Sequence, residues 1–108
     1  MMNEQQRLLG ALGMCRKAGK LVRGFDAVEE SVMKGKAWLV LLASDLSPKT
    51  ARRAQEFCED LVPCRRMPLT QTDLLDVAHK PTGVFAVADE NFAKLCEKHL
   101  GNKEDNIE

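Results

Sequence analysis

The side chains with the chemistry for catalysis are few and scattered in this sequence. It has two histidines, His79 and His99, and four cysteines at distant positions. A catalytic site needs a nucleophile, a base or a metal cluster held in one region, and the sequence shows no such grouping. The cysteines form no Cys-x-x-Cys pair, so neither a disulfide framework nor a zinc site is expected. We therefore expect no enzyme, no metal and no cofactor.

Two further patterns bear on phosphate chemistry. Gly10 and Gly13 lie within an expected helix and lack the Gly-Lys-Ser/Thr ending of a phosphate-binding loop. Each glycine lowers the stability of that helix by about 1 kcal/mol relative to Ala. We therefore expect another backbone to pack closely against the helix at these positions. Asp45 follows an apolar strand, as in a receiver domain, but the acidic pair that a receiver needs is missing. We expect Asp45 to accept hydrogen bonds from loop amides instead.

Basic residues offer a different chemistry, the binding of phosphate groups. Lys plus Arg and Asp plus Glu number 16 each, so a strongly basic field over the whole chain is excluded. Each local basic group alone is most often a solvated surface. If the loops at 23–25 and 79–82 lie on one edge, with Lys20 and Lys36 near them, cations and helix amides together suffice to bind folded RNA. The basic groups are 16–23, Lys34 with Lys36, Lys49 with Arg52 and Arg53, and Arg65 with Arg66.

The elements that position these residues are arranged around one apolar stretch, 37–43. It is too short for a helix and is bounded by Gly35 and Pro48, which predicts a strand buried on both faces. Ser47 then caps a new helix, and Pro48 suits its first position. In open α/β sheets, ligands bind most often beyond the C-terminal ends of strands. We therefore expect function at the loops rather than in the core.

The rest of the chain alternates helices and strands. Asn3 with Gln6 predicts a capping box at the first helix, Thr70 with Asp73 predicts another, and Asp89 caps the last helix. This alternation predicts an α/β fold, a single-domain three-layer α/β/α sandwich. The expected order is helix 3–18, strand 20–24, helix 25–34, strand 37–43, helix 48–61, strand 64–67, helix from 70, loop 79–83, strand 84–88 and helix 90–100.

Length and composition fit one globular domain. A chain of 108 residues with 44% hydrophobic and 30% charged residues is long enough for a single core. We expect this domain to span 1–100 and an acidic, disordered tail to follow at 101–108. The N-terminus lacks the layout of a signal peptide, and no apolar run is long enough to cross a bilayer. A cytoplasmic protein without membrane contact is expected.

Several segments taken together resemble one protein family. They are LLGALGMCRKAGKLVRG at 8–24, AV at 27–28, GKA at 35–37, LVLLASDLS at 39–47 and FAVADENFA at 85–93. The chain resembles the bacterial YlxQ-like branch of the ribosomal protein L7Ae/L30e/S12e superfamily over nearly all of 8–95. The resemblance implies an α/β/α sandwich with a four-stranded mixed sheet. It also implies binding to structured RNA, typically kink-turns, in association with ribosomal or translation-related RNA.

The resemblance extends to one RNA-binding motif with three replacements. In that family the RNA-contacting loop has the form Gly-x-Asn-Glu-x-x-Lys and opens a helix. Stretch 24–30 matches it with Gly24 retained, and the replacements are Asp26 for Asn, Ala27 for Glu and Glu30 for Lys. Each lost charged hydrogen bond costs about 1–3 kcal/mol. The family's second contact loop corresponds to 79–83, which is more polar here, so altered RNA specificity is implied.

The leading hypothesis is a non-enzymatic RNA-binding protein associated with the ribosome or translation. It contacts structured, kink-turn-like RNA, ribosomal RNA included, through the loops at 23–30 and 79–83. A second hypothesis is a protein-interaction module of the same fold that has lost kink-turn recognition. It docks on a ribosome-associated or transcription protein through the acidic start of the helix 25–34. The expected RNA-contacting residues are Lys20, Arg23, Gly24, Phe25, Asp26, Ala27, Glu30, Lys36, His79, Lys80 and Thr82.

Overall fold

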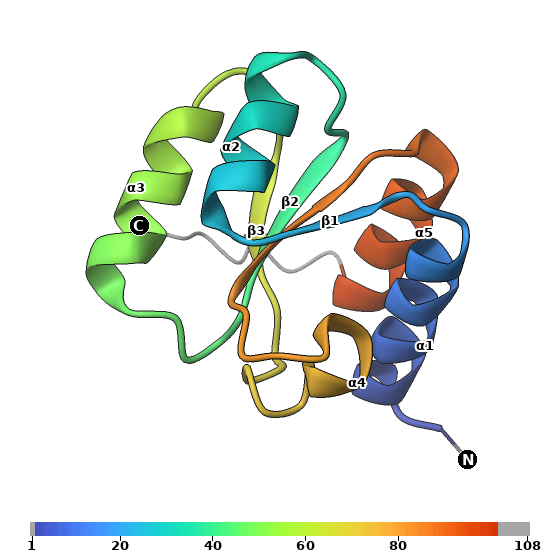
Figure 1. Ribbon diagram of the computed structural model, residues 1–108. Helices are drawn as coiled ribbons and strands as arrows, with labels where there is room; N and C mark the ends of the chain where they lie inside the picture. The colour runs from blue at the N-terminus through green and yellow to red at the C-terminus, as the bar shows by residue number, and fades with distance from the viewer. Residues whose placement is uncertain (1, 102–108) are drawn as a thin grey trace.

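The computed structural model describes residues 2–101, in which helices and strands alternate (Figure 1). Residues 102–108 of the predicted acidic tail lie outside the described residues. The helices are α1 (Glu4–Lys17), α2 (Phe25–Met33), α3 (Pro48–Cys58), α4 (Leu75–Ala78) and α5 (Glu90–Leu100). The strands are β1 (Leu21–Arg23), β2 (Leu39–Leu42), β3 (Cys64–Arg66) and β4 (Val84–Val87).

The four strands form one mixed sheet in the order β1-β4-β2-β3. Strand β4 is antiparallel to both neighbours, with Ala86 opposite Val22 of β1 and Val40 of β2. Strands β2 and β3 are parallel, with Val40 opposite Cys64. Every residue of the two inner strands, β2 and β4, is buried. The predicted mixed sheet and its buried central strand are confirmed.

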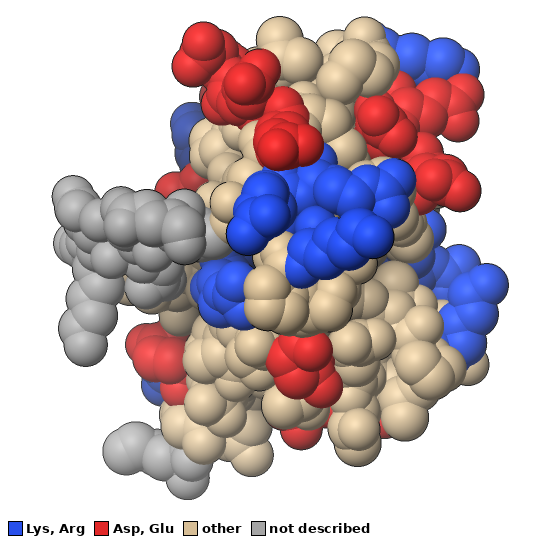
Figure 2. Space-filling view, turned by 90° about the vertical axis from the view of Figure 1, so that its left-hand side faces the viewer, with Lys and Arg blue, Asp and Glu red and all other residues tan. Residues whose placement is uncertain are grey.

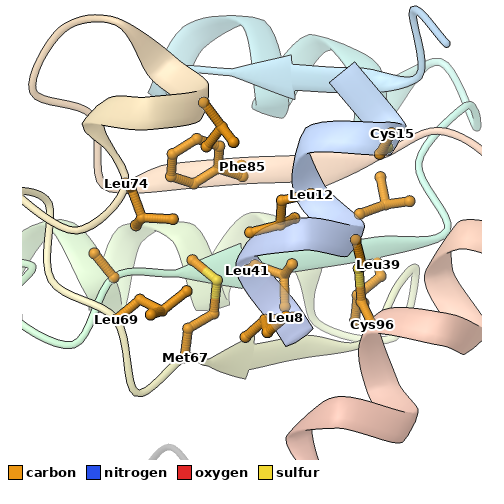
Figure 3. Packing of buried hydrophobic residues seen from close by; sticks show 14 of the residues in the cluster. Leu8, Leu12, Cys15, Leu39, Leu41, Met67, Leu69, Leu74, Phe85 and Cys96 are labelled. Atoms are coloured by element: carbon orange, nitrogen blue, oxygen red, sulfur yellow. The ribbon is translucent and has the colours of Figure 1, made fainter. Parts of the chain in front are cut away.

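Helices cover both faces of this sheet, which confirms the three-layer α/β/α sandwich. Helices α1, α4 and α5 lie on one face, and α2 and α3 lie on the other (Figure 1). Because successive strand residues point to opposite faces, Leu39 and Leu41 of β2 pack in the cluster beneath α1 and α5, whereas Val40 and Leu42 pack beneath α2 and α3. Figure 3 shows the first cluster, with Leu12 of α1 facing the sheet. Each such buried side chain stabilises the fold by about 1.5–3 kcal/mol.

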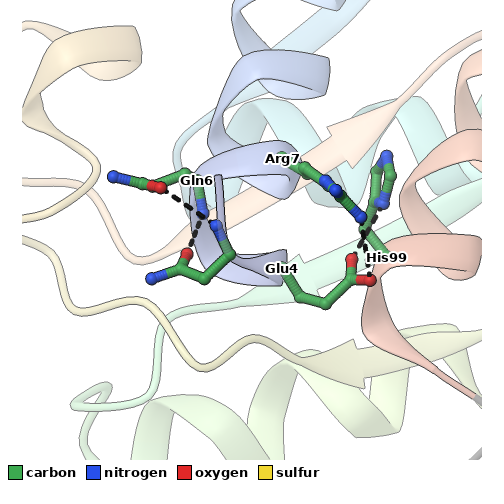
Figure 4. Close-up of polar contacts among 5 residues, drawn as sticks. Glu4, Gln6, Arg7 and His99 are labelled. Atoms are coloured by element: carbon green, nitrogen blue, oxygen red, sulfur yellow. Dashed lines mark hydrogen bonds and ion pairs between the residues drawn. The ribbon is translucent and has the colours of Figure 1, made fainter. Parts of the chain in front are cut away.

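Three long helices begin at the side chains that the sequence predicts. Asn3 accepts the Gln6 amide while the Gln6 side chain accepts the Asn3 amide, so the capping box is complete (Figure 4). Ser47 accepts the amide three residues ahead and begins α3. Asp89 does the same for α5. Each cap contributes on the order of 1 kcal/mol to stability.

Helices α1 and α5 also meet through a polar contact near the chain ends. Nδ1 of His99 lies 3.1 Å from Oε1 of Glu4 (Figure 4), and the His99 side chain is only 14% exposed. Nη1 of Arg7 lies 3.6 Å from the other oxygen of Glu4. His99 therefore helps to join the first and last helices.

Two predictions about burial are wrong. No backbone packs against Gly10 or Gly13, since the space at Gly10 is open and a Cβ at Gly13 would meet only Cγ1 of Val77, at 3.9 Å. Nothing in the structure explains these two glycines. Trp38, inside the predicted buried strand, is 50% exposed because β2 begins one residue later and Trp38 lies in an open hollow beside α5.

Helix α3 ends earlier than predicted. Its last residue is Cys58, because Glu59 takes a left-handed φ of 29°. Leu61, the last residue of the predicted helix, therefore lies outside α3 and is 65% exposed. Within α3, Phe57 is buried, at 9% exposure, in the cluster shared with α2.

The segment after β3 is less helical than predicted. Thr70 and Asp73 do exchange the expected hydrogen bonds, at 3.0 and 3.1 Å. The residues that follow form turns, and α4 starts only at Leu75. Reciprocal capping bonds can therefore close a turn without starting a helix directly.

The strand directions give the sheet two different ends. Strands β1, β2 and β3 run one way and β4 runs the other. The loop end is the one where Arg23, Leu42 and Arg66 end their strands and Val84 begins β4. The Trp38 end is the one where Leu21, Leu39 and Cys64 begin their strands and Val87 ends β4. Helices α2 and α3, which follow β1 and β2, both begin at the loop end (Figure 1).

Candidate nucleic-acid interface

Helix α2 begins at the loop end without a side-chain cap. Its N-cap residue, Gly24, has φ 98° and ψ 149°, a conformation that L side chains rarely adopt. The Gly24 amide donates to the Val84 carbonyl at 2.9 Å and joins the start of α2 to the start of β4. Within the described part of the chain, the amides of Phe25, Asp26 and Ala27 have no hydrogen-bond acceptor. Three N–H groups and the positive end of the helix dipole are thus open to an anion.

This open start distinguishes α2 from the other long helices. In α1, α3 and α5, the side chain of Asn3, Ser47 or Asp89 accepts an amide of the first turn. Gly24 has no side chain with which to do so. A ligand oxygen can occupy the position that those side-chain oxygens take elsewhere, and a phosphate oxygen suits it.

The loop 79–83 lies beside this helix start, and both of its ends are fixed. His79 ends α4 with a left-handed φ of 65°, and the Gly83 carbonyl accepts an amide from the residue after β2 at 2.9 Å. The Thr82 hydroxyl donates to the Lys80 carbonyl at 3.0 Å, and the Thr82 side chain is buried. Thr82 therefore shapes the loop from within. His79 and Lys80 are exposed.

Arg23 connects the two segments. Its Nη1 donates to the Ala78 carbonyl at 3.1 Å, although 55 positions separate the two residues in the sequence. Ala78 is the last residue of α4, directly before the loop 79–83. Together with the bond from Gly24 to Val84, this contact places 23–27 and 79–83 side by side at the loop end. The structure brings these two segments together, as the RNA-binding hypothesis requires.

Lys20 and Lys36 lie at the other end of the sheet, contrary to prediction. The Lys20 carbonyl accepts the Ala88 amide at 2.8 Å, and the Lys36 amide donates to the Ser31 carbonyl at 2.9 Å after the last turn of α2. Both residues are therefore at the Trp38 end. They are separated from Gly24 by the length of β1 or α2, on the order of 10–15 Å. The prediction failed because each of these elements carries the chain from one end of the sheet to the other.

The side chains at the start of α2 are acidic or apolar. Asp26 and Glu30 are exposed, and Ala27 offers no polar group. Oε2 of Glu30 lies 2.7 Å from Nζ of Lys34, and this hydrogen bond and charge lower the pKa of the Glu30 carboxyl. Glu30 is thus ionised at neutral pH. Any contact between α2 and a phosphate depends on the backbone amides.

A pair of residues outside the predicted contact set lies next to Gly24. Cζ of Arg53 is 4.5 Å from the centre of the Phe25 ring. The Phe57 ring meets Phe25 edge-on, with the ring centres 5.2 Å apart. With two glutamates, these residues line an open hollow of about 290 Å³. The signal in the sequence was the four-residue spacing of Arg53 and Phe57, which places them on one face of a helix.

The other side chains that could take part in chemistry have structural roles or are buried in the core. Asp45 accepts the Gln71 amide at 3.0 Å, as predicted. Burial raises the pKa of Cys15 to about 11 and that of Cys96 to about 12, so both are neutral thiols in the core. Among residues 2–101, no three His, Cys, Asp or Glu side chains gather in a way that would hold a metal ion. No helix within that range is long and apolar enough to span a membrane.

The sequence has named relatives over most of its length. Residues 6–98 match the ribosomal protein L7Ae/L30e/S12e/Gadd45 family. The chain is 29% identical over 100 residues to a protein named RNA-binding protein YlxQ from Enterococcus faecium, which covers 90% of this chain and 96% of that relative. It is 31% identical over 83 residues to the RNA-binding protein YlxQ of Bacillus subtilis, which covers 76% of this chain and 83% of that relative.

The fold also has relatives among solved structures. A protein of unknown function from Bacillus halodurans matches with a TM-score of 0.80 at 23% identity, over 87% of this chain and 96% of its own. The Giardia lamblia 15.5kD RNA binding protein matches with a TM-score of 0.75 at 23% identity, over 96% of this chain and 91% of its own. At this level of identity, the two matches show a shared fold.

Proposed function

The chain belongs to the ribosomal protein L7Ae/L30e/S12e/Gadd45 family, in its YlxQ-like branch, and we propose that it is a non-enzymatic RNA-binding protein. The relatives from Enterococcus faecium and Bacillus subtilis are named as RNA-binding proteins. The observation that carries the proposal is the open N-terminus of α2 beside the loop 79–83. Free amides and a helix dipole on a rigid turn can hold the phosphates of a folded RNA.

The proposed ligand is RNA with a sharp, kink-turn-like bend. A bent strand can reach the α2 amides and the exposed residues His79 and Lys80 at once, whereas a straight duplex presents a regular, wide surface. Asp26 and Ala27 lack the donor and acceptor that the family motif places there, so the backbone amides carry more of the contact. We expect weaker discrimination among bent RNAs as a result. Ribosomal or translation-related RNA is the proposed source, and the cytoplasm is the proposed location.

Binding to a kink-turn hairpin tests this proposal. Its affinity is measured by fluorescence anisotropy at several salt concentrations, beside a hairpin whose internal loop is replaced by paired bases. Lys80→Glu reverses an exposed charge in the loop 79–83. We expect the affinity to fall about tenfold and the slope of log affinity against log salt to fall by about 1.

Lys36→Glu is the matched control, because it makes the same charge change at the Trp38 end. This variant is expected to bind the kink-turn hairpin like the wild-type chain. Absence of binding to either hairpin at low salt would contradict the proposal. Equal losses for Lys80→Glu and Lys36→Glu would contradict its location at the loop end.

The acidic start of α2 and the exposed Trp38 favour a second candidate, a protein-binding module. Trp38 is 50% exposed and lines an open hollow of about 300 Å³ with four residues of α5. Tryptophan is enriched at protein interfaces relative to other surfaces. A chain that binds no folded RNA but retains a ribosome-associated or transcription protein, and loses it in Asp26→Asn or Trp38→Ala, would favour this candidate.

A further inference from the structure

Helix α3 carries a charge pattern that local helix energetics disfavour. Its exposed cations Lys49, Arg52 and Arg53 are spaced at i, i+3 and i+4, so like charges are neighbours on one face. Lys49 also lies in the first turn, where the positive end of the helix dipole repels a cation. Helices α1, α2 and α5 each have an acid in the first turn, whereas α3 has none. Proteins keep locally unfavourable patterns of this kind mainly at functional sites, such as a site that binds an anionic ligand.

Within the described residues, no acid forms an ion pair with these cations, although Glu29 and Glu56 line the same hollow as Arg53. By contrast, Lys34 pairs with Glu30 at 2.7 Å. A phosphate group approaching α3 would therefore neutralise three exposed cations without breaking an existing ion pair.

One of these cations is held in place next to the open start of α2. The Arg53 guanidinium lies over the Phe25 ring, with Cζ 4.5 Å from the ring centre, and Phe57 supports that ring from its edge. This contact already restricts the guanidinium in the free protein. Binding a phosphate therefore costs less side-chain conformational entropy. Phe25 directly follows Gly24, so the guanidinium and the open amides lie next to each other.

Helix α2 cannot supply these cations itself. From Phe25 to Met33 it carries three carboxylates and no Lys or Arg. Helix α3 packs beside it over a shared apolar cluster. Figure 2 views this side of the molecule and shows Lys and Arg gathered in the middle of the face, with Asp and Glu around them. A phosphate near the start of α2 therefore meets negative side chains on α2 and positive ones on α3.

We propose that Lys49, Arg52 and Arg53 bind the phosphate backbone of the RNA that the loop end contacts. The inference rests on the proposed function and adds a second surface to it. The loop end orients the RNA through its amides and the loop 79–83, and α3 holds the strand that continues past the bend. The ligand is therefore a bent RNA with a helical arm that extends over α3.

Two charge-matched double variants of the full chain test this inference with the same kink-turn hairpin. Arg52→Gln with Arg53→Gln removes two exposed cations from α3, and Lys94→Gln with Lys98→Gln removes two from α5, on the other face of the sheet. We expect the α3 variant to bind about 10- to 100-fold more weakly and to lose about 1.5 from the salt slope, as for two phosphate contacts. The α5 variant should keep the wild-type slope. Thermal melts followed by circular dichroism check that both variants are folded.

A rescue variant separates charge from structure. Adding Glu30→Lys to the α3 double variant places a cation on the neighbouring helix, and we expect it to recover at least threefold in affinity. An α3 variant that binds like the wild type, while Lys80→Glu still weakens binding, would overturn the role of α3 and leave the proposed function standing. An equal loss in the α5 variant would also overturn it, because net charge would explain the effect. A wild-type chain that binds no folded RNA would overturn both proposals.

Discussion

The two ends of the sheet are built from the same four strands, yet they offer different groups to a ligand. At the loop end, α2 and α3 begin, and the start of α2 leaves three amides open. At the Trp38 end, those helices finish, and α5 begins with an amide already bound by the Asp89 carboxylate. The difference follows from chain direction, because β1 and β2 run toward the loop end and a helix follows each of them.

Under the proposed function, the comparison implies that cations alone are a poor guide to the position of an anion site. Lys20, Lys34 and Lys36 all lie at the Trp38 end, but Lys34 is paired, and the C-terminal ends of α2 and α3 there present carbonyl groups. The proposed contact at the loop end depends on the open amides of α2, which no pattern of charge in the sequence reveals. Matched variants at the two ends of the sheet separate the contribution of the cations from that of the backbone amides.

The largest expected effect is on the free energy of unfolding, and it distinguishes one aromatic residue near each end of the sheet. Phe85 of β4 is fully buried, at 0% exposure, whereas Trp38 is 50% exposed. Phe85→Ala should lower the free energy of unfolding by about 3–5 kcal/mol because it leaves a cavity between α1, α4 and the sheet. Trp38→Ala should lower it by less than about 1 kcal/mol. Urea unfolding followed by circular dichroism measures both, and equal losses would contradict the burial described here.

Two glycines with positive φ give the next comparison. Gly24 at the loop end has φ 98°, and Gly35 at the Trp38 end has φ 71°, with open space where each Cβ would lie. Replacement by Ala should cost about 1–2 kcal/mol of stability at either position through backbone strain. Only Gly24→Ala should also weaken RNA binding, by about tenfold, because it moves the open amides. Equal RNA affinities for the two variants would show that the start of α2 is not the contact.

A smaller effect is expected at the two ends of β1. Arg23→Lys keeps the charge but removes the forked donor that bonds the Ala78 carbonyl. We expect a loss of about 1 kcal/mol in stability, faster amide hydrogen exchange in 79–83 and RNA binding weakened about threefold. Lys20→Ala, at the other end of the strand, should leave exchange and binding unchanged. Unaltered exchange in Arg23→Lys would show that Arg23 does not hold the loop.

The smallest effect on RNA binding is expected from alkylation of Cys64, a thiol at the Trp38 end. A hydrogen bond from Cys58 and the charge of Arg66 lower the pKa of Cys64, whereas burial raises those of Cys15 and Cys96. At about pH 8 more of Cys64 is thiolate, so iodoacetamide should alkylate it first, as mass spectrometry of the digested protein would show. RNA affinity should not change, because Cys64 begins β3 at the Trp38 end of the sheet. Faster alkylation of Cys15 or Cys96 would contradict the buried positions of these thiols.

Local signals in the sequence predicted most of the fold. The caps at Asn3, Ser47 and Asp89 and the apolar stretch before Pro48 mark real element boundaries. The candidate site was predicted less completely. The sequence predicted the proximity of 23–27 and 79–83 but not the positions of Lys20 and Lys36, because the length of β1 or α2 separates these lysines from the loop end.

The sequence by itself determined what depends on neighbours three or four positions apart. Capping bonds, the fixed φ of Pro48 and the freedom of Gly24 are local free energies, so they can be recognised without a fold. Only the tertiary structure decided that Arg23 bonds Ala78, that Arg53 lies over Phe25 and that Trp38 is exposed. These outcomes depend on strand order and register across the sheet, which bring together residues far apart in the chain, and no local pattern contains that information.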